Sequence, residues 1–123
     1  MKIRIRGNSV RLRLSRTEVS QLAAGSQLQE KTQFPGSEFT YTLRESDAIS
    51  NLDASFSGSE MTMSIPRGWA ATWAGNDQVG FQHNLPLPGG NSLYLLLEKD
   101  FKCIDAPPGE DQSDNYEHPK GAC

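Results

Sequence analysis

The sequence predicts an α+β domain built mostly from antiparallel strands, and two observations support this fold class. Several short segments alternate apolar with polar residues, which is the period of a half-buried strand, and glycine-containing turns separate them. The same order of segments returns at an offset of 51 residues. We therefore expect a duplicated hairpin–helix–hairpin unit, with repeats at about 1–47 and 52–100 and about eight strands and two short helices.

The size and charge of the chain limit the function classes. Its 123 residues suit one domain, which we assign to residues 1–103, followed by an acidic C-terminal arm, 104–123. A net charge of -3 argues against a general nucleic-acid binder. No apolar run is long enough to cross a membrane, and the basic N-terminal segment alternates with apolar residues, unlike a signal peptide. We predict a cytoplasmic protein.

The opening segment "KIRIRGNSVRLRL" predicts the first hairpin. Two alternating runs flank Gly7-Asn8, and a two-residue loop at that point sets the register of the strands. Ile5 then lies opposite Val10, and Ile3 opposite Leu12. These four apolar side chains share one face, as a half-buried hairpin requires.

The rest of the first unit contains a helix and a second hairpin. Ser15 and Glu18 have the spacing of a capping box, and Gly25 suits the residue just after a helix. A strand is expected around 27–34, and the Pro35-Gly36 turn connects it to the strand "EFTYTLRE".

The second unit matches the first position by position. The offset places Phe56 on Ile5, Gly58 on Gly7 and Pro66 on Ser15, and proline is favourable at a helix start. Neither half buries its apolar face alone, so we expect one core shared by both, as in a fused dimer. Eight strands could close into a barrel or pack as two sheets, with helices covering open ends, and both arrangements stay open.

The outward face of the first hairpin is basic. The second unit has Asp53, Ser55, Thr62 and Ser64 at the matching positions, so the repeat does not demand this charge. Like charges opposed on a sheet are unfavourable, so we expect an anion nearby. Three readings stay open: a solvated edge, docking of the chain's own acidic arm, or an external phosphate or nucleic acid. Nucleic acid is disfavoured because no aromatic residue is interleaved with the arginines, as a surface for base stacking would require. The residues are Lys2, Arg4, Arg6, Arg11 and Arg13.

The two thiols are the other concentrated chemical feature. Cys103 ends the last expected strand, and Cys123 ends the arm. A reversible disulfide would close a loop worth about 3 kcal/mol in the chain-entropy model. We hypothesise a thiol-responsive or redox-responsive binding protein that uses this pair. A purely structural arm without chemistry is the alternative that needs no site.

Metal binding is a further alternative for the arm. Cys103, His118 and Cys123, with Asp111, Asp114 or Glu117, offer the sulfur, imidazole and carboxylate ligands that zinc or iron accept. Their spacing matches no standard zinc pattern. The run "EDQSDN" also offers oxygen ligands for calcium or magnesium, but it lacks the glycine and the distal glutamate of an EF-hand loop. No other cofactor is predicted.

Two further residues, His83 and Trp69, are weighed individually. His83 lies in the apolar stripe of an expected strand and is interpreted as a structural histidine. Trp69 is expected on the surface of the second helix, where it could line a pocket or a partner site. No serine has an evident base, and no carboxylate pair follows from spacing. We therefore find no catalytic motif and do not predict an enzyme.

The segments "MKIRIRGNSVRLRL", "NDQVGF" and "EKDFKC…EDQSDNY…P…C" resemble a family of small bacterial proteins of unknown function. The resemblance covers nearly the whole chain, and its two ends are the most specific parts. It implies a cytosolic bacterial protein whose Cys-bearing tail is a regular feature. It implies no activity, cofactor or catalytic residue.

Overall fold

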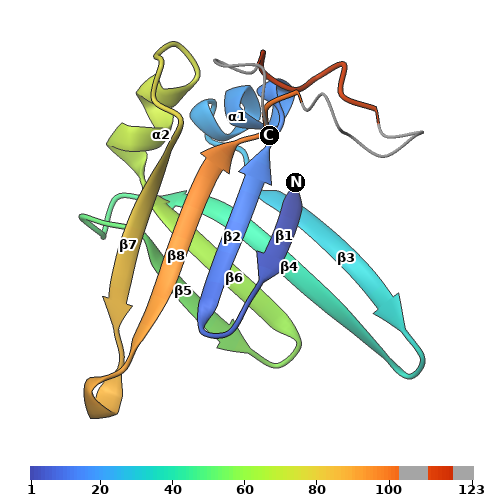
Figure 1. Cartoon of the computed structure of the whole chain (residues 1–123), viewed down its shortest axis with the longest axis vertical. Helices are drawn as coiled ribbons and strands as arrows, with labels where there is room; N and C mark the ends of the chain where they lie inside the picture. Colours follow the sequence, from blue (N-terminus) through green and yellow to red (C-terminus); the bar gives the residue numbers. More distant parts are fainter. Residues whose placement is uncertain (103–110, 118–123) are drawn as a thin grey trace.

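A computed structural model describes residues 1–102 and 111–117 of the chain (Figure 1). The described elements follow the predicted order of hairpin, helix and hairpin, repeated once. The strands β5 and β6 and the helix α2 each begin 51 positions after β1, β2 and α1, which is the predicted offset. In chain order the elements are β1 (Lys2–Ile5), β2 (Ser9–Leu14), α1 (Arg16–Ala23), β3 (Leu28–Phe34), β4 (Ser37–Ser46), β5 (Asp53–Ser57), β6 (Glu60–Pro66), α2 (Arg67–Trp73), β7 (Gly80–Pro86), the 3-10 turn η1 (Pro88–Gly90) and β8 (Ser92–Lys99).

The strands form two four-stranded sheets, β1-β2-β8-β7 and β3-β4-β6-β5. All four hairpins are antiparallel, so the α+β class with mostly antiparallel strands is confirmed. The two sheets lie as separate layers and do not close on each other, which decides against the barrel alternative.

Each sheet contains one hairpin from each unit. The two hairpins of a sheet meet through a parallel pair at its centre, β2 with β8 and β4 with β6. These parallel pairs were not predicted from the sequence, because they join strands far apart in the chain and no turn sets their register. This arrangement supports the duplication, since each unit contributes one hairpin to each sheet.

Both helices lie at one end of the two layers, while the hairpin turns lie toward the other end (Figure 1). The helices pack against each other, so they cover one open end together rather than one end each. Helix α1 begins with the predicted capping box, in which Glu18 N–H donates to Ser15 Oγ and Ser15 N–H donates to Glu18 Oε1. Pro66 takes the N-cap position of α2.

The first hairpin has the predicted loop and register. Arg6 and Ser9 exchange backbone hydrogen bonds across Gly7-Asn8, and Gly7 has φ of 53°. Its counterpart Gly58 has φ of 60°, so both tight turns require the left-handed conformation that glycine tolerates. Ile3 pairs with Leu12 as expected.

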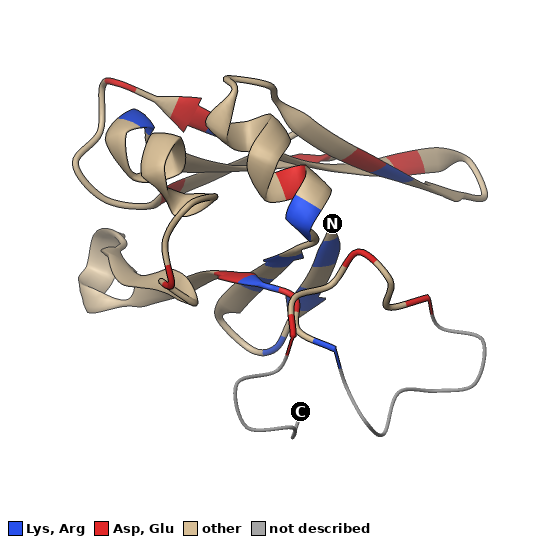
Figure 2. Ribbon diagram, turned by 90° about the horizontal axis from the view of Figure 1, so that it is seen from above, with Lys and Arg blue, Asp and Glu red and all other residues tan. Residues whose placement is uncertain are grey.

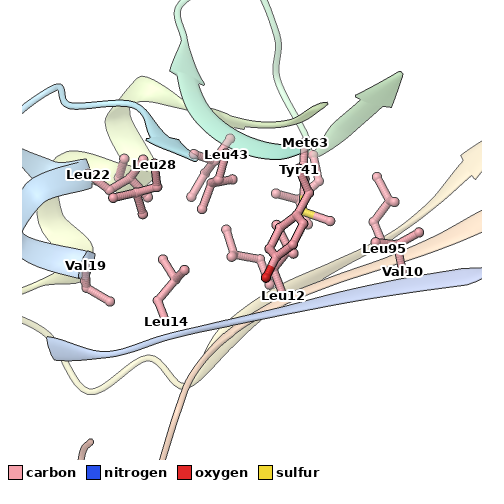
Figure 3. Close-up of a cluster of buried hydrophobic side chains, with 14 of the residues drawn as sticks. Val10, Leu12, Leu14, Val19, Leu22, Leu28, Tyr41, Leu43, Met63 and Leu95 are labelled. Atoms are coloured by element: carbon pink, nitrogen blue, oxygen red, sulfur yellow. The ribbon is translucent and has the colours of Figure 1, made fainter. Parts of the chain in front are cut away.

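The core lies between the layers and is shared by both units (Figure 3). Leu12 and Leu97 from one sheet, Leu43 and Met63 from the other, and Trp73 from α2 are all fully buried. Burying a side chain of this size stabilises the fold by about 1.5–3 kcal/mol relative to exposure. Among the described residues, neither helix has the length and apolar content needed to span a bilayer.

Candidate functional site

The predicted basic residues lie on β1 and β2 and just after β1 (Figure 2). Their alternation with the buried Val10, Leu12 and Leu14 places them on the outer face of the sheet β1-β2-β8-β7. We call this set the Arg-rich face: Lys2, Arg4, Arg6, Arg11 and Arg13. The register pairs Arg4 with Arg11 and Lys2 with Arg13, as the sequence predicted. The face therefore concentrates positive charge on one hairpin.

Two carboxylates, one on β8 and one just after it, neutralise part of this charge. Glu98, on β8 beside Arg13, accepts from Arg11 Nε at 2.6 Å and lies 3.4 Å from Arg13 Nε. Asp100 lies 2.9 Å from Lys2 Nζ and 3.9 Å from Arg13 Nη1. The parallel pairing of β2 with β8 brings these acids beside the arginines. The opposed pair Lys2 and Arg13 therefore shares Asp100, while Arg11 and Arg13 share Glu98.

Arg4 and Arg6 are exposed and have no ion-pair partner among the residues that the structure describes. Five cations on the face against Glu98 and Asp100 leave an excess of three positive charges within this set. Arg4 and Arg11 line two adjoining depressions of about 280 and 220 Å³. The second depression is also lined by Arg6, Ser9, Val10, Tyr94 and Leu96.

Tyr94 is a residue of this face that sequence reasoning missed. It lies on β8 opposite Ser9, two positions from Leu96, which pairs with Arg11. Its hydroxyl donates to Gln82 Oε1 on β7 at 2.6 Å, so the ring is tethered across the sheet. No short-range signal pointed to it, because the parallel pairing that places it beside the arginines joins distant parts of the chain.

The described part of the arm, residues 111–117, docks at the start of helix α1. Arg16 N–H donates to the Asp114 carbonyl oxygen at 2.9 Å, and Thr17 Oγ1 donates to Asp114 Oδ1 at 3.0 Å. These contacts satisfy backbone donors that a helix start leaves unpaired. Hydrogen bonds from Ser15 and then Thr17 lower the pKa of the Asp114 carboxyl.

Residues 100–102 and 116 hold the arm to the end of the last strand. Tyr116 N–H donates to Asp100 O at 2.8 Å, and Lys102 N–H donates to Tyr116 O at 2.6 Å. The Phe101 and Tyr116 ring centroids lie 5.9 Å apart. Lys102 Nζ and Glu117 Oε1 form an ion pair at 2.8 Å. The arm therefore returns alongside the chain just before Cys103.

Lys99 is a buried cation beside Tyr116 of the arm, with 4% of its surface exposed. Its Nζ donates to Asn76 O at 2.7 Å and lies 4.9 Å from the Tyr116 ring centroid and 5.8 Å from that of Trp73. Burial lowers the pKa of Lys99, and the charge of Asp77 opposes that shift. The two aromatic rings and the carbonyl explain how the ammonium group is accommodated, so Lys99 is structural.

The predicted thiol and metal residues fall mostly outside the described part of the chain. Cys103, His118 and Cys123 lie there, so their pairing or metal binding stays a prediction. Asp111 accepts from the Ser113 N–H at 2.9 Å, while Asp114 is bonded to α1. Within residues 1–102 and 111–117, no group of three or more His, Cys, Asp or Glu side chains could hold a metal ion.

Trp69 lines a pocket, as the sequence suggested, although it is half-buried. Its ring stacks on Phe81 with centroids 5.0 Å apart and planes 18° apart, and Phe81 meets Trp73 edge-on. The pocket, of about 440 Å³, has uncharged walls that also include Thr72 and Gln78. His83 lies half-buried on β7 opposite Leu95.

Comparison with known proteins yields one match. The model of a family of unknown function, DUF7009, matches residues 1–120. No curated protein matches the chain, and no solved structure matches it. The matched range includes the Arg-rich face and the docked segment of the arm.

Proposed function

The chain belongs to this family, whose function is unknown, and we propose that it is a binding module that holds an anionic partner on the Arg-rich face. The observation that carries the proposal is the state of Arg4 and Arg6. They are exposed beside an aromatic ring and, among the described residues, have no anionic partner. Exposed, unneutralised guanidinium groups in one depression are the groups that recognise carboxylate or phosphate.

The neighbouring cations support this role. Arg11 and Arg13 are held by Glu98, so their side chains keep a defined geometry. Arg4 and Arg6 remain available to bind a ligand. A surface ordered in advance loses less side-chain entropy when a ligand binds. The corresponding hairpin of the second unit, β5–β6, has serine or threonine at the positions of Arg4, Arg6 and Arg11, so the fold itself does not need these charges.

A heparin column tests the proposal, since heparin is a polyanion of high charge density. The variant R4S/R6S introduces the residues that the second unit has at those positions, Ser55 and Ser57. The matched control, K31S/R44S, removes two cations from the outer face of the other sheet. We expect the wild type and the control to need similar salt for elution, and R4S/R6S to elute earlier. Equal elution of all three would overturn the proposal.

The thiol pair is a second candidate, and one observation favours it. Lys102 and Glu117, the chain neighbours of Cys103 and His118, are joined by an ion pair, so the described residues next to these two positions are adjacent. Cys123 follows Glu117 by six residues, and an extended chain spans at most about 3.3–3.6 Å per residue. The length of the chain therefore allows Cys123 to reach Cys103. In the cytoplasm, where we place the protein, such a pair would respond to oxidation.

Intact mass with and without reductant, together with thiol titration, tests this candidate. A disulfide lowers the mass by two hydrogens and removes both free thiols. Two freely reactive thiols under oxidising conditions would contradict it. Elemental analysis of protein purified without chelator tests the version in which Cys103, His118 and Cys123 bind zinc or iron, and that version fails if the metal content stays well below one per chain.

A further inference from the structure

The Arg-rich face is one part of the outer surface of its sheet, which also includes the outward residues of β8 and β7. The two helices lie at the end of the layers and do not cover this surface (Figure 2). The register defines rows of neighbouring outward residues that run across the four strands. One row is Arg4, Arg11, Leu96 and Gln82, and the next row contains Ser9, Tyr94 and Asn84. The arginines of the first row are thus followed by Leu96 and Gln82, and the aromatic ring of Tyr94 lies in the adjacent row beside Asn84.

This order of groups suits one chemical class of anion. Guanidinium groups bind phosphate oxygens, an aromatic ring stacks on a base, and side-chain amides pair with base edges. We infer that the Arg-rich face binds single-stranded nucleic acid, with backbone phosphates at Arg4 and Arg6 and a base stacked on Tyr94. The inference rests on the proposed function and names its partner.

Tyr94 distinguishes this partner from an acidic protein. An acidic peptide would need only the charges, whereas Tyr94 lines the same depression as Arg4, Arg6 and Arg11. The bond from its hydroxyl to Gln82 restrains the ring before any ligand arrives. A restrained ring beside phosphate-binding groups is the combination found in surfaces that bind single strands.

The β2–β8 pairing supplies the aromatic residue that a surface binding nucleic acid needs. The arginine segment itself contains no aromatic residue, but Tyr94 joins it from a segment more than 80 residues away. The net charge of -3 describes the whole chain. Association depends on the local field of the binding face, where Arg4 and Arg6 are exposed and have no anionic partner among the described residues.

Fluorescence anisotropy with labelled probes tests the inference on the full chain. The probes are oligo(dT) and oligo(U) of about 12 nucleotides, a duplex of the same length, inorganic polyphosphate and a polyglutamate peptide. The comparison of oligo(dT) with oligo(U) separates DNA from RNA as the natural source. The variants are Y94L, which removes the ring, Y94F, which keeps it, and R4S/R6S with its control K31S/R44S.

We expect the single strands to bind more tightly than the duplex, polyphosphate or polyglutamate. Y94L should weaken single-strand binding about tenfold and leave polyphosphate binding unchanged, and Y94F should stay close to the wild type. R4S/R6S should weaken the binding of every probe. For the single strands, the magnitude of the negative slope of log affinity against log salt should fall by about 1.4, since each phosphate that an arginine neutralises contributes about 0.7 to that magnitude.

The outcomes separate the inference from the proposed function. If Y94L binds single strands like the wild type, or if polyphosphate or polyglutamate binds as tightly as they do, the nucleic-acid inference is wrong while anion binding stands. If R4S/R6S matches K31S/R44S for every probe, anion binding at this face is wrong as well. Binding of no probe at low salt overturns both.

Discussion

Gly80 lies where the backbone of β8 leaves no room for a side chain. A Cβ atom at this position would lie 2.3 Å from the Leu97 carbonyl oxygen. We predict that G80A destabilises the protein by about 1–3 kcal/mol, because the clash is with backbone in a paired sheet. Urea denaturation measures this destabilisation.

The matched control is G68A on helix α2, where no atom lies within 4 Å of the added Cβ. This change should be neutral or should stabilise the protein by up to about 1 kcal/mol, since alanine favours a helix over glycine. Equal effects of the two substitutions would contradict the packing of β7 against β8.

Asp114 acts as an additional cap of α1, and its effect depends on pH. Its folded-state pKa lies below the ordinary 3.8, so its stabilising effect is complete above that pH and is lost as pH falls through the folded value. D114A should cost on the order of 1 kcal/mol at neutral pH, as other helix caps do. Thermal melts at several pH values should show the difference from wild type shrinking below pH 3.8.

T17V provides the matched control, because it removes the hydroxyl that donates to Asp114. When D114A is measured in the T17V background, the pH-dependent part of its effect on stability should be smaller than in the wild-type background. A D114A penalty that stays constant down to strongly acidic pH would show that the carboxylate charge is not involved.

At the scale of elements, the docked segment 111–117 behaves as a clasp over α1 and the end of β8. Removal of residues 103–123 should lower the melting temperature, because it exposes Lys99 and removes the hydrogen bonds between Asp114 and the start of α1. Most of the described contacts are hydrogen bonds and ring packing, and the exposed ion pair of Lys102 with Glu117 is the salt-sensitive exception, so most of the decrease should persist at high salt. Thermal melts at low and high salt measure this.

A decrease that appears only at low salt would instead support the sequence-based hypothesis that the acidic arm lies on the arginines. An unchanged melting temperature would contradict the clasp. For residues 111–117, the three described carboxylates already have other partners: Ser113, Thr17 and Lys102.

Much of each element could be predicted from the sequence, and the reason is local. The Gly7-Asn8 loop and the capping box of α1 depend on residues within a few positions of one another, and both formed as predicted. The first hairpins of the two units, β1–β2 and β5–β6, have registers that agree with the offset, with Ile3–Leu12 matching Ala54–Met63. The partners of Arg11 and Arg13 could not be predicted, because Glu98 reaches them only through a parallel pair.

At the scale of the whole molecule, the two units are interdependent. Each sheet takes a hairpin from each unit, so a single unit would lose a parallel partner in both sheets. We predict that a fragment of residues 1–49 does not form a stable folded monomer, and that mixing it with 50–123 restores the native circular dichroism and a cooperative melt. A monomeric, cooperatively folded 1–49 fragment would contradict the shared core.

The sequence by itself determined the local patterns: alternating strands, tight turns, helix starts, and the offset that repeats them. These depend on contacts within about ten residues, where chain geometry allows few alternatives. The tertiary structure decided which hairpins share a sheet, where the arm docks, and which groups stand beside Arg4 and Arg6. Those features depend on pairing across most of the chain, because burying both apolar faces at once requires each unit to give one hairpin to each layer.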